Sequence, residues 1–139
     1  MECTIRWSGA GMSFIAETGS NHLLAMDGAP DGGGRTLAPR PMETVLAGAG
    51  GCTAYDVVVI LKKSGQDVTG CEVRLEAERA QTDPKVFTRI HYRFTVRGRN
   101  LKRNVVEQAV RLSHEKYCSA TAILEKTAQI TRDLEIVEG

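Results

Sequence analysis

Aromatic residues are scarce in this sequence, and neither sign of charge is in excess. Phe, Trp and Tyr make up 5% of the 139 residues, and 18 basic residues face 17 acidic ones for a net charge of +1. Without a strong field of one sign, the chain is not expected to bind nucleic acid. Its 42% hydrophobic content argues against a disordered chain. We therefore predict one globular domain over residues 1–139.

The sequence also lacks the features of secretion, of membrane insertion and of a cysteine scaffold. The N-terminus has no basic segment followed by a long apolar run, and no stretch approaches ~18 apolar residues. We therefore expect a cytoplasmic protein without a membrane partner. Four cysteines are too few for a disulfide scaffold, and no Cys or His pair has the short spacing of a zinc site. We expect no metal and no cofactor. If two of these cysteines alternate between the thiol and disulfide forms, a chemical role is a better explanation for the pair than a structural one.

Period-2 alternation of apolar and polar residues predicts the strands. Three short strands with turns between them predict an antiparallel meander: Cys3–Trp7, Met12–Ala16 and Leu23–Met26. Two longer strands flank turn residues and predict a hairpin: 71–78 and 88–97. A last strand is predicted over 130–136. The Gly- and Pro-rich segment 27–41 predicts a mobile loop without regular structure, and a candidate lid.

The most apolar segment, 42–63, predicts a long helix in the middle of the fold. Pro41 suits its first turn, and Lys62 and Lys63 suit its last. Apolar residues lie on every helical face, and one small sheet covers only one side. We therefore predict that this helix packs against its copy in a homodimer.

Three glycines, at positions 48, 50 and 51, each cost this helix roughly 1 kcal/mol relative to alanine. Close packing of another backbone, or access for a substrate, would explain them. Further along, an N-cap at Asn100 predicts a helix to Tyr117, and an N-cap at Ser119 predicts a short helix to about Lys126. Because strands and helices are segregated along the chain, we predict an α+β fold with a mainly antiparallel sheet.

Cys52 is the strongest candidate for chemistry. A thiol in the first half of a helix can feel the positive end of the helix dipole, and the thiolate is the reactive form. Cys118 lies at the predicted junction of two helices, where it can approach the start of the long helix. For both, a buried packing role is the alternative. Cys3 and Cys71 fall on the apolar phase of strands and are assigned to packing, and only His114 lies near enough in sequence to tune Cys118.

Three segments resemble the OsmC/Ohr family, and specifically its YhfA-like branch: Pro41-Met42-Glu43, Gly50-Gly51-Cys52 and Glu115-Lys116-Tyr117-Cys118-Ser119-Ala120. The likeness covers nearly the whole chain. It implies an OsmC-like, tightly intertwined homodimer with sites at the interface. It also implies that Cys52 attacks an organic hydroperoxide and that Cys118 resolves the sulfenic acid as a disulfide. A dithiol reductant, such as a lipoylated protein, and a role in stress or detoxification follow from the same resemblance.

The sequence departs from the better-characterised members of the family at the groups that activate the thiol. Those members carry Asn-Pro-Glu ahead of the helix, where this chain has Arg40-Pro41-Met42, and an arginine near the first strands, where Gly9–Met12 has none. Arg40 and Glu43 are the candidate substrate-binding replacements. Our leading hypothesis is a thiol peroxidase with a largely apolar pocket. The alternatives are a noncatalytic dimer that binds a small apolar or electrophilic molecule, and a structural protein with inert thiols.

Overall fold

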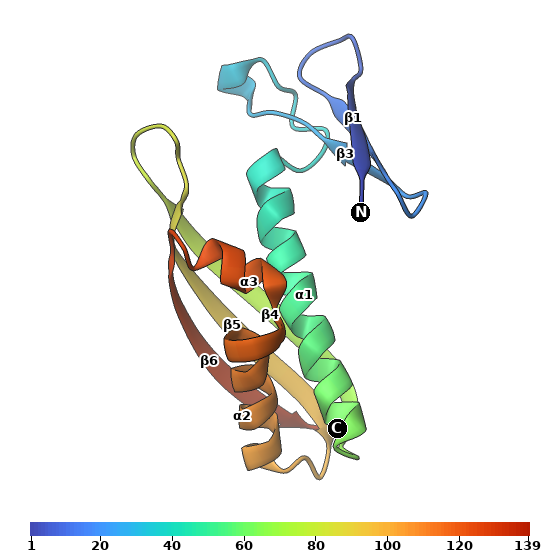
Figure 1. Ribbon diagram of the computed structural model, residues 1–139, viewed down its shortest axis with the longest axis vertical. Coiled ribbons are helices and arrows are strands. Elements are labelled where there is room, and N and C mark those ends of the chain that lie inside the picture. Colours follow the sequence, from blue (N-terminus) through green and yellow to red (C-terminus); the bar gives the residue numbers. More distant parts are fainter. The chain divides into compact units, whose positions relative to one another are not determined.

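The chain forms two compact units in the computed structural model, which describes all residues 1–139 (Figure 1). The first unit comprises Met1–Ala47 and the second comprises Gly48–Gly139. Each contains a three-stranded sheet, and the long helix α1 (Pro41–Lys63) begins in the first unit and continues in the second. Our prediction of a single domain over 1–139 stays a prediction.

The first sheet is the antiparallel meander that the alternation predicts, in the order β1-β2-β3. Its strands are β1 (Cys3–Trp7), β2 (Phe14–Thr18) and β3 (Leu23–Met26). The second strand begins two residues later than predicted. The reason is the turn before it: Gly9 and Gly11 adopt positive φ, and the N–H of Ser8 donates to the carbonyl of Ser13 at 3.0 Å. This turn takes up Met12, which sequence periodicity had assigned to the strand.

The segment that follows β3 is organised around one buried carboxylate. Asp27 is 2% exposed and accepts hydrogen bonds from the backbone N–H groups of Gly28 at 2.7 Å, Arg35 at 3.3 Å and Leu37 at 3.1 Å. These bonds lower the pKa of Asp27 below its ordinary value. A 3₁₀ helix, Pro30–Gly32, lies inside the segment. The prediction of a loop without any regular element is therefore wrong, because composition does not reveal an acceptor that gathers backbone donors.

Helix α1 begins and ends within one residue of its predicted bounds. Only one stripe of it is buried, made up of Ala49, Gly50, Thr53, Val57 and Leu61. By length and composition it could cross a membrane, since an 18-residue window has a mean hydropathy of 1.6. Our expectation that no stretch approaches a membrane span is thus wrong on hydropathy alone. The core helix of a soluble protein passes the same test, so this is weak evidence for insertion.

The second sheet has the order β4-β5-β6. The strands β4 (Asp67–Arg79) and β5 (Phe87–Arg99) form the predicted antiparallel hairpin, whereas β6 (Gln129–Glu138) runs parallel to β5. The connection from β5 to β6 is therefore a crossover that carries helices. The sheets are antiparallel except for this one pair, as expected of a mainly antiparallel α+β fold.

The core of the second unit lies on one face of this sheet. Alternate side chains of β5 are at most 3% exposed: Ile90, Tyr92, Phe94 and Val96. In Figure 1, α1 and the helix that follows β5 run alongside the strands of this sheet. At Gly50, a Cβ would lie 2.8 Å from Cδ1 of Leu75, so a close approach of α1 to β4 explains this glycine. Gly48 and Gly51 have open space at the corresponding position, so close packing within this chain does not explain them.

The crossover contains α2 (Arg103–Leu112), one π-helical turn (Ser113–Tyr117) and α3 (Ser119–Leu124). Both predicted N-caps are wrong. Asn100 has a positive φ of 53°, and Lys102 precedes α2 without a side-chain cap. The N-cap of α3 is Cys118, whose side chain accepts a hydrogen bond from the N–H of Thr121. The cysteine at this junction thus performs the role that we had assigned to Ser119.

Candidate functional site

Two of the four cysteines meet in the second unit. Cys52 comes from α1 and Cys118 from the junction before α3, and their sulfur atoms and a carboxylate oxygen of Asp56 all lie within 4.8 Å of one another. Both cysteines are free thiols. The proximity of Cys52 and Cys118, which the sequence could only suggest, is therefore present. We call these three side chains the thiol cluster.

Helix α1 places Cys52 and Asp56 on the same side. They are four residues apart, one helical turn, and both are half-buried, whereas their neighbours Thr53 and Val57 are fully buried. The two side chains therefore lie along the border of the buried stripe. Sequence reasoning missed Asp56, although a carboxylate one turn after a candidate nucleophile, inside an otherwise apolar stretch of helix, was a usable signal.

Cys118 is held much more tightly than Cys52. It is 2% exposed, and its sulfur accepts hydrogen bonds from the hydroxyl of Thr121 at 3.1 Å and from the N–H of Thr121 at 3.4 Å. The hydroxyl of Tyr92 lies 3.1 Å from that of Thr121. Because Thr121 directs its proton toward the sulfur, Tyr92 is the donor in this second bond. A chain of hydrogen bonds thus runs from Tyr92 through Thr121 to Cys118.

The environment of Cys118 favours its protonated form. Burial raises the pKa of this thiol above its ordinary value of 9.0, the two donors of Thr121 lower it in part, and the neighbouring Cys52 raises it. Burial also raises the pKa of Tyr92. At neutral pH Cys118 is therefore a thiol with a proton to donate, beside the more accessible sulfur of Cys52.

The carboxylate of Asp56 is held by hydroxyl groups. Ser113, which is fully buried, donates to Oδ2 of Asp56 at 3.0 Å, and its oxygen lies 2.7 Å from Oγ1 of Thr53. Since the proton of Ser113 goes to the carboxylate, Thr53 donates to Ser113. None of the ion pairs within 4.0 Å in the chain includes Asp56. The thiol cluster thus holds a fixed carboxylate without a positively charged side chain next to it.

The two candidate substrate-binding residues belong to the first unit. The guanidinium of Arg40 pairs with the carboxylate of Glu43 at 3.8 Å, and the N–H of Arg40 donates to Oε1 of Glu43 at 3.2 Å. These contacts stabilise the start of α1 in the manner of a capping box. Their role toward a substrate stays a prediction.

The remaining candidate residues lie outside the thiol cluster. Cys71 is half-buried, and burial raises its pKa. Cys3 is exposed, as are all five residues of β1, so its assignment to packing is wrong within this chain. His114 lies 3.2 Å from the carboxylate of Glu125 and also contacts Arg132, so it is held by charged partners.

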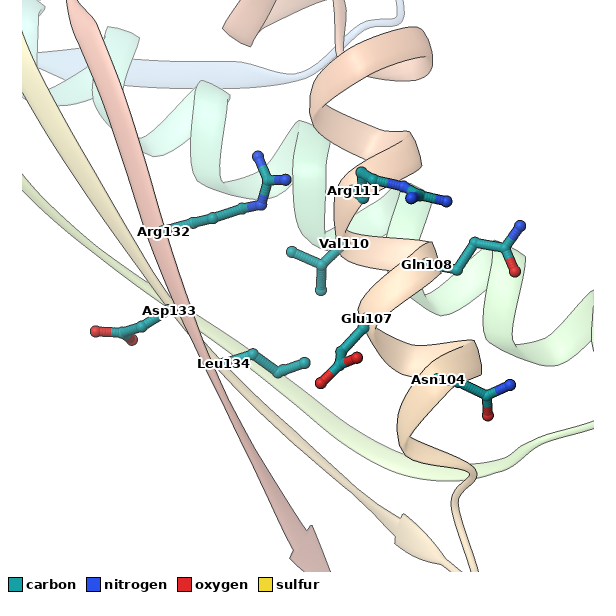
Figure 2. Close-up of a pocket in the computed structure, with 8 residues that line it drawn as sticks. All are labelled: Asn104, Glu107, Gln108, Val110, Arg111, Arg132, Asp133 and Leu134. Atoms are coloured by element: carbon teal, nitrogen blue, oxygen red, sulfur yellow. The ribbon is translucent and has the colours of Figure 1, made fainter.

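A groove of about 550 Å³ with a mixed polar and apolar lining lies between α2 and β6 (Figure 2). It is lined by Asn104, Glu107, Gln108, Val110, Arg111, Arg132, Asp133 and Leu134. In the figure Glu107 and Val110 point toward β6, whereas Asp133 points away from α2. The groove contains no thiol, and it is not the largely apolar pocket that we expected for a hydroperoxide. A cavity beside Thr53, Tyr92 and Thr121 has only about 10 Å³, room for one water at most.

Comparison with known proteins agrees with this arrangement. The pattern of the family described as OsmC-like protein matches residues 32–132. This chain belongs to the OsmC-like family. Protein YhfA of Escherichia coli strain K12 is 47% identical over 137 residues, which cover 99% of this chain and 98% of that protein.

Solved structures share the OsmC-like fold over nearly their whole length. A hypothetical protein from Aquifex aeolicus VF5 is 27% identical with a TM-score of 0.85, and the match covers 99% of this chain and 96% of that one. The organic hydroperoxide resistance protein OhrB of Bacillus subtilis is 17% identical with a TM-score of 0.62, over 96% of each chain. The predicted family and the predicted α+β fold are confirmed. A close pair of thiols in an OsmC-like protein fits a redox role.

Proposed function

We propose that this protein reduces organic hydroperoxides, with Cys52 as the nucleophile and Cys118 as the resolving thiol. The observation that carries the proposal is the approach of the two sulfur atoms to within 4.8 Å in an OsmC-like chain. The substrate class is suggested by the name of the OhrB protein, an organic hydroperoxide resistance protein with the same fold. A physiological role in stress or detoxification belongs to the same proposal.

The reaction has two steps. The Cys52 thiolate attacks one oxygen of the O–O bond, that bond breaks, and Cys52 becomes a sulfenic acid while the other oxygen leaves as an alkoxide that takes a proton from solvent. The sulfur of Cys118 then attacks the sulfenic sulfur. A disulfide forms, and the hydroxyl leaves as water with the thiol proton.

Exposure and hydrogen bonding support this division of roles. Cys52 is half-buried and can meet a substrate, whereas Cys118 is 2% exposed. The raised pKa of Cys118 keeps this thiol protonated until it is needed. The two donors of Thr121 stabilise negative charge as it develops on the attacking sulfur.

The cycle needs two electrons from a dithiol to reopen the disulfide. Such a dithiol enters through Cys52, because Cys52 is the more accessible sulfur. A lipoylated protein is the candidate reductant, and the cytoplasm is the compartment that keeps such thiols reduced.

We also propose that the protein works as a homodimer. The uncovered side of α1 forms a groove of about 470 Å³ with β4, lined by Gly51, Ala54, Tyr55, Val58, Val59, Lys62 and Cys71. Tyr55 is 71% exposed there. A second copy of α1 would cover this apolar strip. Sedimentation should give a dimer, and Tyr55→Glu should shift it to monomer; a wild-type monomer at micromolar concentration overturns this part.

The experiment for the reaction is a thiol count by intact mass after one equivalent of cumene hydroperoxide. Wild type should lose two thiols as a Cys52–Cys118 disulfide, Cys118→Ser should stop at a sulfenic acid, and Cys52→Ser should not react. Cys71→Ser and Cys3→Ser are the matched controls and should behave as wild type. Persistence of all four thiols for many minutes overturns the reductase.

A noncatalytic binding protein is the second candidate. The observation in its favour is that the charged side chain beside the thiols is the carboxylate of Asp56, not an arginine. In this case Cys52 would bind a small electrophile without turnover. Peroxide-resistant thiols, together with stoichiometric capture of an alkylating probe at Cys52, would support it.

A further inference from the structure

The thiol cluster has the composition of a metal site. It joins two sulfur atoms and one carboxylate oxygen, from positions 52, 56 and 118, within 4.8 Å of one another. Cysteine and aspartate are both ligands of Zn²⁺. The spacing of these residues along the chain resembles no short zinc motif, which is why the sequence predicted no metal. We propose that the reduced protein binds one soft divalent cation, with zinc as the probe, through Cys52, Asp56 and Cys118.

The distances suit a tetrahedral ion. Zn–S bonds of about 2.3 Å and Zn–O bonds of about 2.0–2.2 Å place neighbouring ligand atoms about 3.5–3.8 Å apart. The three ligand atoms therefore need to close by about 1 Å, within reach of side-chain rotation. Three protein ligands leave the fourth position open for water or a small ligand, an arrangement that is typical of catalytic zinc sites rather than of structural ones.

The carboxylate of the thiol cluster has no cationic side chain as a partner, because no ion pair in the chain includes Asp56. The two cysteines ligate as thiolates, so their protons pass to the buffer as the ion binds, and the charge of the divalent ion offsets the negative charge that remains. A Cys52–Cys118 disulfide has no thiolate to offer, so the site exists only in the reduced protein.

The groups around the ligands are those that orient metal ligands in other proteins. Ser113 donates to Oδ2 of the Asp56 carboxylate at 3.0 Å, and Thr121 donates twice to the sulfur of Cys118. Ligating carboxylates and thiolates are commonly held by such partners, and loss of one costs about 10–100-fold in metal affinity. The same side chains thus hold Asp56 and Cys118 near their ligand positions before an ion arrives.

The site does not depend on peroxidase activity, so its test uses no peroxide. Reduced protein is titrated with Co²⁺ under argon, and the thiolate-to-cobalt charge-transfer absorbance is recorded. Zinc then displaces the cobalt, and a chromophoric zinc chelator gives the affinity. We expect one ion per chain. Zinc should also slow alkylation of Cys52 by iodoacetamide, and EDTA should restore the rate.

Variants identify the ligands. Cys52→Ser, Cys118→Ser and Asp56→Ala should each lower zinc affinity at least tenfold, and Ser113→Ala should lower it by about 10–100-fold. Cys71→Ser and Cys3→Ser should bind as wild type, and circular dichroism confirms that each variant is folded. Absence of a thiolate band at one equivalent, or wild-type affinity in Asp56→Ala, overturns the proposal. Zinc binding without peroxide-driven disulfide formation would support this site and overturn the proposed reductase. Disulfide formation without zinc binding would support the reductase and overturn this site.

Discussion

The two faces of α1 differ although both are apolar in sequence. One face is buried in the chain through Ala49, Gly50, Thr53, Val57 and Leu61, whereas the other carries Tyr55, Val58 and Val59 in an open groove. Cys52 and Asp56 lie along the border between the two faces. Hydrophobicity alone therefore does not say which face a helix buries, and the proposed nucleophile, Cys52, lies where burial ends.

The largest expected effect is a difference in stability between substitutions on the buried face and on the open face of α1. Leu61→Ala removes a fully buried side chain and should lower the free energy of unfolding by about 2–5 kcal/mol. Val59→Ala, on the open face, should cost less than about 1.5 kcal/mol at low protein concentration. Urea unfolding followed by circular dichroism measures both. The gap should narrow as concentration rises if a second copy covers Val59, and equal costs at every concentration would remove the distinction.

Two neighbouring glycines give a matched pair. Gly50→Ala places a methyl group 2.8 Å from Cδ1 of Leu75, whose side-chain end has to move, and should destabilise the protein by about 1 kcal/mol. Gly51→Ala meets no atom within 4 Å and should gain up to about 1 kcal/mol of helix propensity. Thermal unfolding of the two variants, measured side by side, checks that one substitution lowers the stability and the other raises it. Stabilisation by both would mean that α1 does not pack closely on β4.

A smaller effect concerns the polar contact on the buried face. Thr53→Val keeps the shape of the side chain but removes its hydrogen bond to Ser113, and should cost about 1 kcal/mol. Because Ser113 still donates to Asp56, the cluster should keep its geometry. Urea unfolding gives the cost, with Thr44→Val as the comparison, because it removes a longer hydroxyl bond of 3.3 Å to the carbonyl of Arg40 at the start of α1. A neutral Thr53→Val would show that this bond does not hold α1 in place.

The last prediction concerns how the free energy of unfolding changes in alkaline solution, and no effect is expected at neutral pH. The pKa values of Cys71, beside the open face, and of Cys118, on the other side, are both raised by burial. Below the ordinary value of 9.0 both thiols are protonated in the folded and unfolded states, so they contribute no pH dependence. As pH rises above 9 the unfolded chain ionises first, and the free energy of unfolding should fall. Urea unfolding between pH 7.5 and 10.5 should show a shallower fall in Cys118→Ser and Cys71→Ser, and an unchanged slope in both would contradict the assignment.

Periodicity predicted the elements of this fold better than their pairing. Alternation and apolar density located β1, β3, α1 and the β4–β5 hairpin, because these follow from local burial. The parallel pairing of β6 with β5 could not be predicted, because the alternation of apolar and polar residues in a strand does not depend on the direction of its neighbour. The caps were also missed, since the N–H of Asn100 is bound by the distant Glu138 and the sulfur of Cys118 replaces a hydroxyl.

The candidate site was half predictable. Residue type and family resemblance singled out Cys52 and Cys118. Thr121 and Ser113 carry no such signal, because serine and threonine in helices are common and their partners are set by long-range folding. The contact between Thr53 and Ser113 spans 60 residues. Asp56 was within reach of sequence reasoning, but only by asking what lies one helical turn from a nucleophile.

The parallel pairing of β5 with β6 ties the chemistry to the order of folding. Cys52 precedes the β4–β5 hairpin and Cys118 follows it, in a crossover that β6 must anchor. The two sulfurs are therefore brought together by contacts of high sequence separation, which form slowly compared with a helix or a hairpin. In the reaction proposed above, a Cys52 that is oxidised before the two sulfurs meet has no resolving partner and proceeds to sulfinic acid, which thiols do not reverse. On this proposal, completion of the fold is what makes oxidation of Cys52 a reversible event.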